Sequence, residues 1–293
     1  MIDYHIHPDY SQDAGGTLAE YCAAAAAAGL AEICFTTHYE PDPVRAEIEW
    51  VRVRGERRPV GSDWVHDYFA DIAACRRKFA PLVILAGVEV GYEPGLEGTV
   101  SGFLDRNPFD FVLGAVHCLD HVSITAGDEL NRFRREYAHH GAGFVAARYL
   151  EFVRAAAGSQ LFDCIAHLDI YRKYIRELFD EDFDRTVDDS LDATLRFIAT
   201  SGTGIEVNSS ALRRGSDEPY PSIGILHRAV AAGVHTFTTG SDAHRPTDVG
   251  RGIETVTGIL AGLGVTPARF RARKCEPAPR PPSLQLPDFD AAV

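Results

Sequence analysis

The chain has 293 residues, 45% of them hydrophobic, and a formal net charge of −13 at pH 7. This length suits one large α/β domain, and the negative charge argues against a nucleic-acid backbone as the ligand. No apolar run approaches 18 residues, no basic-then-apolar leader precedes Asp3, and six scattered cysteines form no CxxC pair. We therefore expect a cytoplasmic protein with no membrane or nucleic-acid partner and with reduced thiols; oligomeric state is not indicated.

Segments rich in Val, Ile, Leu and Phe alternate along the chain with longer amphipathic stretches. The short apolar segments predict seven strands, near residues 2–7, 32–37, 83–90, 111–117, 162–167, 204–208 and 235–241. The amphipathic stretches predict helices over residues 17–29, 64–79, 128–157, 182–201, 222–232 and 249–263. Repeated βα units imply parallel strands joined by helical crossovers.

Parallel strands that are buried on both faces close most simply into a barrel, with the active site at their C-terminal ends. An open doubly wound sheet is the alternative, but it would gather ligands at one switch point instead of around a ring. We expect a βα barrel over residues 1–265 and a loosely packed tail, containing Pro and Arg, over residues 266–293. Residues 47–63 are Arg- and Glu-rich without an apolar period, which predicts a long surface loop over the active-site mouth.

Metal-capable side chains close six of the seven predicted strands. His5 and His7 alternate with Ile6, so an extended strand projects both imidazoles to one side. The other strand-end donors are His38, Glu89, His117, His167, Asp242 and His244. Imidazole and carboxylate donors that meet at one barrel rim predict a polynuclear metal site.

Each donor also has a structural explanation. His38 could be a hydrogen-bonded core histidine, and His117 and His167 could bond backbone carbonyls. Asp13 could simply begin the turn that continues through Gly15 and Gly16. Glu89 follows a continuous apolar run, where an unpaired carboxylate would be costly to bury, so a cation partner is the simpler interpretation.

The motifs DYHIH, TTH, GVEVGY, GAVH, IAHLD and GSDAH occur in the order of the polymerase-and-histidinol-phosphatase (PHP) superfamily, which the chain resembles over residues 3 to about 252. IAHLDIYRKY, IEVNSSALRRG, YPS and GSDAHRPTDVG resemble its histidinol-phosphate phosphatases. The resemblance implies a distorted (β/α)7 barrel that holds three metal ions, which are zinc, manganese or iron.

The resemblance also implies a division of the ligands. One ion would bind His5, His7, Glu89 and Asp242; a second would bind Glu89, His117 and His167; the third would bind Asp13, His38 and His244. Glu89 would bridge two ions. Where the family commonly has an aspartate before the second-motif histidine this chain has Thr37, and its first motif continues as Pro8-Asp9-Tyr10. A hydroxyl polarises an imidazole less than a carboxylate does, so the orientation of His38 is in question.

Ions held about 3.5–4 Å apart can activate a shared water for attack on phosphorus. The predicted catalytic residues are Glu89 and Asp242, and the predicted substrate-binding residues are Arg172, Lys173, Asn208, Arg213 and Arg214. By resemblance, we expect hydrolysis of L-histidinol phosphate, a small phosphate ester, in histidine biosynthesis. The alternatives are a broader phosphoesterase acting on nucleotides or other small esters, a metal-binding regulatory module without turnover, and an amidohydrolase. The last usually needs a lysine at a strand end, and none occurs there.

Overall fold

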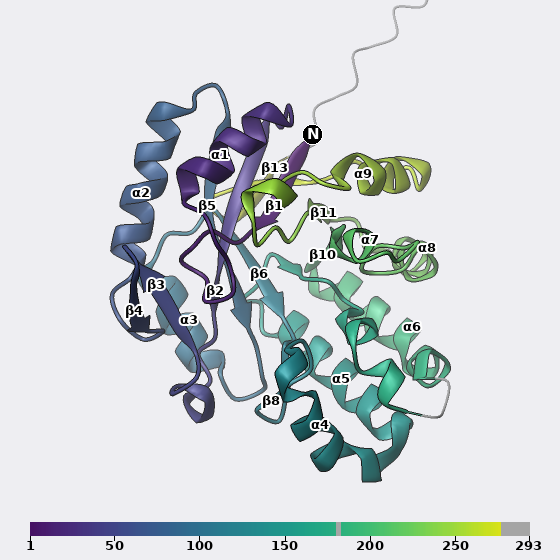
Figure 1. Ribbon diagram of the computed structural model, residues 1–293. Coiled ribbons are helices and arrows are strands. Elements are labelled where there is room, and N and C mark those ends of the chain that lie inside the picture. The colour runs from purple at the N-terminus through teal and green to yellow at the C-terminus, as the bar shows by residue number, and fades with distance from the viewer. Residues whose placement is uncertain (180–182, 277–293) are drawn as a thin grey trace, which may run out of the picture.

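The computed structural model describes residues 1–179 and 183–276, and within these ranges it forms an α/β barrel. Seven parallel strands are neighbours in the order β1-β2-β5-β6-β9-β10-β11, and the predicted barrel is confirmed. The strands are β1 (Ile2–Ile6), β2 (Glu32–Tyr39), β5 (Val83–Gly91), β6 (Phe111–Ala115), β9 (Cys164–Ile165), β10 (Gly204–Asn208) and β11 (Phe237–Gly240). Helices surround this sheet on the outside (Figure 1).

The helices that cover the strands follow the predicted amphipathic stretches, with additions. They are α1 (Leu18–Ala27), α2 (Val65–Lys78), α3 (Glu97–Arg106), α4 (Leu130–Tyr137), α5 (Gly141–Gly158), α6 (Phe183–Ser201), α7 (Ser210–Arg213), α8 (Ile223–Ala231) and α9 (Ile253–Gly262). The single helix predicted over residues 128–157 is wrong, because a 3-10 turn (Ala138–His140) and Gly141, at φ 75°, divide it into α4 and α5. In the described part of the chain, no helix has the length and apolarity needed to cross a membrane.

Helix α1 shows why the local sequence forms these elements. The Thr17 backbone N–H donates to the Glu20 carboxylate at 2.7 Å, and the Glu20 backbone N–H donates to the Thr17 hydroxyl, so the two residues form a capping box. Beyond the C-terminal end, Gly29 takes φ 70°, which glycine adopts without strain.

Strand β1 carries an irregularity that decides which side chains face the barrel interior. Its pairing with β2 shifts register between Asp3 and Ile6. The side chain of Tyr4 lies in the hydrophobic cluster inside the barrel, whereas that of Ile6 packs in the outer core between the sheet and the helices. The alternation therefore changes after Tyr4, and His5 and His7 face the interior at the C-terminal end of the strands.

The barrel closes between its first and last strands through a few backbone and side-chain hydrogen bonds instead of a full ladder. Only one bridge, Ile6 to Ala243, joins β1 to the segment after β11 within the described residues. The buried Asp3 carboxylate accepts hydrogen bonds from the backbone N–H groups of Ser241, at 2.8 Å, and Gly250, at 3.0 Å. The absence of a full ladder between β1 and β11, among the described residues, is the distortion of the barrel.

The surface loop predicted for residues 47–63 is wrong. This segment contains an antiparallel hairpin, β3 (Trp50–Val53) and β4 (Glu56–Pro59), in which Val51 and Val53 are fully buried. The guanidinium of Arg52 donates to the backbone carbonyls of Asp9 and Ala14. The hairpin is thereby fixed to the turn that follows β1.

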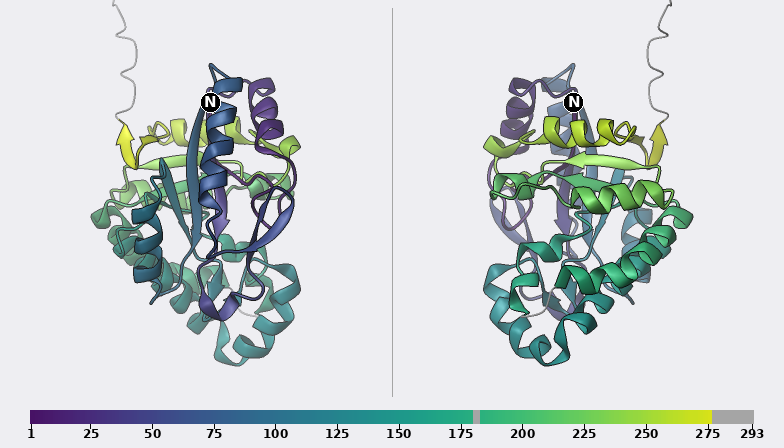
Figure 2. Two further views of the ribbon diagram at one scale, coloured as in Figure 1. Left: turned by 90° about the vertical axis from the view of Figure 1, so that its left-hand side faces the viewer. Right: turned by 90° about the vertical axis from the view of Figure 1, so that its right-hand side faces the viewer.

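The loosely packed tail is also wrong for the residues that the structure describes beyond 265. They include a second hairpin, β12 (Arg269–Arg271) and β13 (Lys274–Glu276), at the end of the molecule that holds residue 1 (Figure 2). Phe270 is buried against Phe111, with ring centroids 4.9 Å apart. The hairpin covers the N-terminal end of the barrel, and residues 277–293 of the predicted tail lie outside the described residues.

Candidate metal centre

The nine predicted ligands converge at the C-terminal end of the strands, around the buried carboxylate of Glu89. Glu89 Oε1 lies 3.3 Å from His5 Nε2, and Glu89 Oε2 lies 3.5 Å from His7 Nε2. Asp242 Oδ1 lies 3.5 Å from His7 Nε2 and 3.8 Å from His5 Nε2. Four donors, at or just beyond the ends of β1, β5 and β11, therefore share one small volume.

His117 and His167 approach the same carboxylate from the other side. Glu89 Oε1 lies 2.9 Å from His167 Nε2 and 3.4 Å from His117 Nε2. The two Nε2 atoms lie 3.4 Å apart. Glu89 is thus central to both groups, as a bridging ligand would be.

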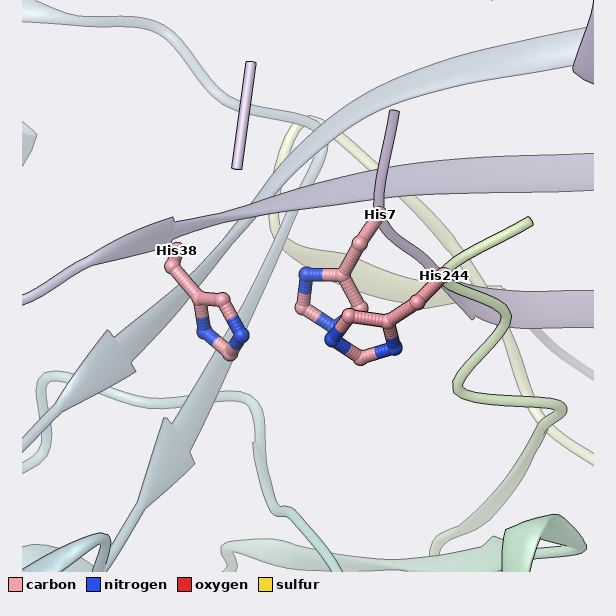
Figure 3. A group of neighbouring side chains, drawn as sticks. All are labelled: His7, His38 and His244. Carbon is pink, nitrogen blue, oxygen red and sulfur yellow. The ribbon is translucent and has the colours of Figure 1, made fainter. Parts of the chain in front are cut away.

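Two further imidazoles, those of His38 and His244, lie beside His7 (Figure 3). The ring of His7 lies 4.1 Å from that of His38 and 4.2 Å from that of His244, measured between centroids. Asp13, whose side chain is 56% exposed, lies 3.2 Å from His244 Nε2 and 3.7 Å from His38 Nε2. His38 Nδ1 also lies 2.9 Å from Glu89, so the groups overlap and the predicted assignment of ligands to individual ions stays a prediction.

The donor set fits cations. Buried atoms without a hydrogen-bond partner include His5 Nε2, His7 Nε2, His38 Nδ1 and Glu89 Oε2. Orphaned buried polar atoms are costly unless an unseen partner satisfies them. Imidazole nitrogen and carboxylate oxygen are ligands that zinc, manganese and iron all accept.

The pKa shifts within the cluster also indicate that its carboxylates are stabilised by nearby positive charge. Burial alone would raise the pKa of Glu89, but the charges of His5, His117 and His38 outweigh it and hold that pKa well below the usual range. Burial alone would lower the pKa of His38, but Glu89 and Asp13 raise it to about 9. Protons on the imidazoles thus supply the positive charge that metal ions would supply.

Two carboxylates lie within hydrogen-bond distance of predicted ligand imidazoles, on the Nδ1 side that faces away from the cluster. Sequence reasoning did not identify either carboxylate as functional. Glu206 Oε1 lies 2.6 Å from His5 Nδ1, and Glu40 Oε1 lies 2.7 Å from His117 Nδ1. Each bond leaves the Nε2 atom of that imidazole facing the cluster, the arrangement by which carboxylates orient metal-binding histidines. A signal for Glu40 existed, because it follows His38 by two residues, directly after the end of β2.

Glycines make room for these two carboxylates. A Cβ atom on Gly240 would overlap the Glu206 carboxylate and the Cβ of His5, and a Cβ on Gly91 would overlap the Glu40 carboxylate. The close approach of backbone and carboxylate is what requires glycine here.

Two predicted ligands lie on strained backbone. His167 takes φ 25° and Asp242 takes φ 54°, in the left-handed region that side chains with a Cβ rarely adopt. Such strain concentrates at functional sites, where surrounding structure enforces it. The Arg213 guanidinium donates to the backbone carbonyls of Ser241 and Asp242 and so supports this turn.

A cleft of about 170 Å³ opens over the cluster. Of the five predicted substrate-binding residues, Lys173 lines this cleft, and Lys173, Arg213 and Arg214 line an adjoining one that Asp13, Asp242 and His244 also border. The structure does not bring the other two to either cleft. Arg172 bonds Asp169 and the Pro219 carbonyl, and Asn208 is fully buried, with its amide bonded to Glu206, so it supports the site instead of meeting substrate at the mouth.

The PHP domain family matches residues 3–210, which is more than half of the chain. The chain belongs to the PHP domain family. A relative from Deinococcus radiodurans, named as a probable histidinol-phosphatase, is 32% identical to this chain, with 94% of this chain and 99% of the relative covered. A histidinol-phosphatase from Lactococcus lactis is 24% identical, with 83% of this chain and 84% of the relative covered.

The PHP-domain fold is also found in solved structures. The crystal structure of histidinol phosphate phosphatase from Lactococcus lactis, complexed with zinc, L-histidinol and phosphate, matches with a TM-score of 0.77 at 22% identity. The match covers 94% of this chain and 98% of the other. It shows that the distorted seven-stranded barrel is shared.

Proposed function

We propose that this protein is a metal-dependent phosphomonoesterase that hydrolyses L-histidinol phosphate to L-histidinol and phosphate, in the biosynthesis of histidine. The observation that carries the proposal is the meeting of nine metal-capable donors under one cleft. The substrate is inferred from the histidinol-phosphatases to which the chain is similar along nearly its whole length.

The donors would hold three ions, zinc, manganese or iron, in the division given by the family resemblance. Glu89 and Asp242, the predicted catalytic residues, would act as ligands that hold the ions beside the reacting phosphate. When bound, such ions activate water for attack on phosphorus and neutralise the phosphoryl oxygens. The same donor chemistry suits all three metals, so the identity of the ions is part of the proposal. The number of ions is part of it too.

The chain's own residues bind and orient the ester. Lys173 places an ammonium group at the border of both clefts, where its Nζ donates to the Thr125 carbonyl at 2.9 Å. Arg214, which donates to Ser210 and to the Tyr220 hydroxyl, adds a second positive charge. These charges attract the phosphate of a small ester and offset the negative charge of the protein.

The barrel walls limit the size of the ligand. Ile170, Cys118 and Ala126 are among the residues that line the cleft, and Arg52 of the β3–β4 hairpin bonds the turn that carries Asp13. A space of about 170 Å³ suits a small phosphate ester and not a polymer. The proposal includes a cytoplasmic location, where a small biosynthetic ester would be met.

The test measures phosphate release from L-histidinol phosphate and from a panel of nucleotides and other small monoesters. Each reaction is run on the purified protein, on chelator-treated protein, and after zinc, manganese or iron is returned, with elemental analysis of every sample. We expect L-histidinol phosphate to give the highest kcat/KM and chelation to abolish the reaction. A higher kcat/KM for a nucleotide would favour the broader phosphoesterase, and no release from any ester would favour a regulatory module.

A further inference from the structure

The lining of the cleft includes two carboxylates that are not among the nine predicted ligands, Glu40 and Glu49. Glu40 is 16% exposed and Glu49 is 6% exposed at the side chain. The Glu49 carboxylate accepts from Arg45 at 2.8 and 3.0 Å and from the Gln12 amide at 2.9 Å. Both carboxylates are therefore held in place and largely removed from water.

The positive charge around these carboxylates does not balance them. Arg45 divides its guanidinium between Glu49 and Glu129, and it lies 2.6 Å from the latter. Glu40 does not bond Arg45 but lies 2.7 Å from His117 Nδ1, so three carboxylates share one guanidinium and one imidazole. Burial raises the pKa of Glu49, and the nearby charge of Glu40 raises it further. An added cation would relieve this accumulation of negative charge.

A negative lining beside a phosphate-binding centre is unfavourable for an ordinary phosphate monoester, because its dianion is repelled. An ester that carries an ammonium group close to its phosphate is attracted both by the carboxylates and by the phosphate-binding centre. In L-histidinol phosphate the ammonium nitrogen is three covalent bonds from the ester oxygen. A ligand of this shape places its two charges on the two oppositely charged parts of one cleft.

We propose that Glu49, together with Glu40, forms the subsite that binds the ammonium group of the substrate and so selects amino-alcohol phosphates. The inference rests on the proposed function, because it takes the phosphate to be held at the metal centre. It assigns specificity to the segment just before the β3–β4 hairpin. Glu40 also orients His117, so Glu49 is the residue on which the subsite can be tested separately.

The test compares wild type, Glu49→Gln and the control Glu129→Gln, all with measured metal content and melting midpoint. Glutamine at 49 keeps an oxygen that can accept from Arg45 but removes the charge. Glu129 bonds the same guanidinium but does not line the cleft. The substrates are L-histidinol phosphate and its deaminated analogue, 3-(imidazol-4-yl)propyl phosphate. Binding of L-histidinol in the presence of inorganic phosphate is measured by calorimetry as a second readout.

In Glu49→Gln we expect kcat/KM for L-histidinol phosphate to fall about tenfold or more, through KM, and the Kd of L-histidinol to rise by a similar factor. The deaminated ester should change by less than about twofold, and Glu129→Gln should leave both esters within that range. An equal loss on the two esters, or the same loss in Glu129→Gln, would overturn the subsite.

The wild-type protein separates this inference from the proposed function. If it releases no phosphate from L-histidinol phosphate, the proposed function fails. If it hydrolyses both esters with equal kcat/KM, the function survives and the ammonium subsite is wrong. This comparison also decides the matter if Glu49→Gln does not fold.

Discussion

His5 Nδ1 lies 2.6 Å from Glu206 Oε1, and the other oxygen of the same carboxylate accepts the His167 backbone N–H at 2.9 Å. One buried side chain therefore sets the orientation of two proposed ligands that stand 162 positions apart. The Asn208 amide donates to the same oxygen at 3.2 Å and fixes the carboxylate in turn. The relationship gives Glu206 a role that can be measured without catalysis.

Glu206→Gln should lower metal affinity about 10- to 100-fold, because an amide no longer fixes the tautomer and orientation of His5 as a carboxylate does. Affinity is measured by competition with a chromophoric chelator, and activity should fall in parallel at limiting metal. Glu254→Gln, on the exposed face of α9, is the matched control and should leave affinity unchanged. Unchanged affinity in Glu206→Gln would show that the carboxylate does not orient a ligand.

Gly240→Ala should lower the free energy of unfolding by about 1–3 kcal/mol and reduce metal content, because the added methyl overlaps the Glu206 carboxylate. Denaturant unfolding and elemental analysis measure the two effects. In Gly258→Ala, within α9, the new Cβ meets no atom within 4 Å. That control should gain about 0.5–1 kcal/mol from helix propensity and keep its metal. Similar behaviour of the two variants would contradict the crowding at Gly240.

Glu89→Gln should abolish turnover and leave the barrel folded, because the amide removes the charge shared by the two ligand groups but keeps the shape. Phosphate release and circular dichroism measure these outcomes. Chelation should lower the melting midpoint of the wild type, since a tightly bound ion at about 1,000 times its Kd contributes about 4 kcal/mol. The chelator-induced shift should be much smaller in Glu89→Gln, and an equal shift would remove Glu89 from the ligand set.

Arg271→Ala should destabilise the protein at neutral pH but not in acid. Burial alone would raise the pKa of Glu32, but hydrogen bonds from Arg271 and Tyr4 and the charge of Arg269 outweigh it and lower that pKa. A lowered folded-state pKa contributes stability above the unfolded value, about 4.3, and this stability is lost as the pH falls through the folded value.

Unfolding free energies of wild type and Arg271→Ala should therefore differ by about 1–2 kcal/mol at pH 7 and converge below about pH 4. Urea titrations across this range measure the difference. Arg251→Ala, at an exposed site on the loop before α9, serves as control and should show no such convergence. A constant difference between wild type and Arg271→Ala would mean that the arginine acts through packing and not through the Glu32 charge.

The sequence was sufficient to predict the strands, because a buried parallel strand is a continuous apolar run. It was also sufficient to predict the donors at their ends, because a polar residue that closes such a run is easily recognised. His38 and Glu89, which are register partners in β2 and β5, could both be predicted in this way. The pairs Glu206–His5 and Glu40–His117 could not, since each joins elements whose adjacency is known only once the barrel closes.

The two hairpins were missed for a different reason. WVRV in β3 and RFR in β12 are too short to show a period, and both lie among arginines that suggest exposure. Their burial depends on partners that are distant in the sequence. Arg52 donates hydrogen bonds to backbone carbonyls after β1, and Phe270 packs against Phe111 inside the barrel. Arg172 and Asn208, predicted to bind substrate, line neither of the two clefts, because a position at or after the end of a strand does not say which way a side chain turns.

The backbone N–H of Asp242 donates to the carbonyl of His5 at 2.7 Å, so the rim of the barrel is completed by residues from the two extremes of the domain. A polypeptide still emerging from the ribosome has His5 and His7 long before it has Asp242 and His244. Incomplete chains thus lack the full set of proposed ligands, and loading of the proposed metal ions would follow translation of almost the entire barrel.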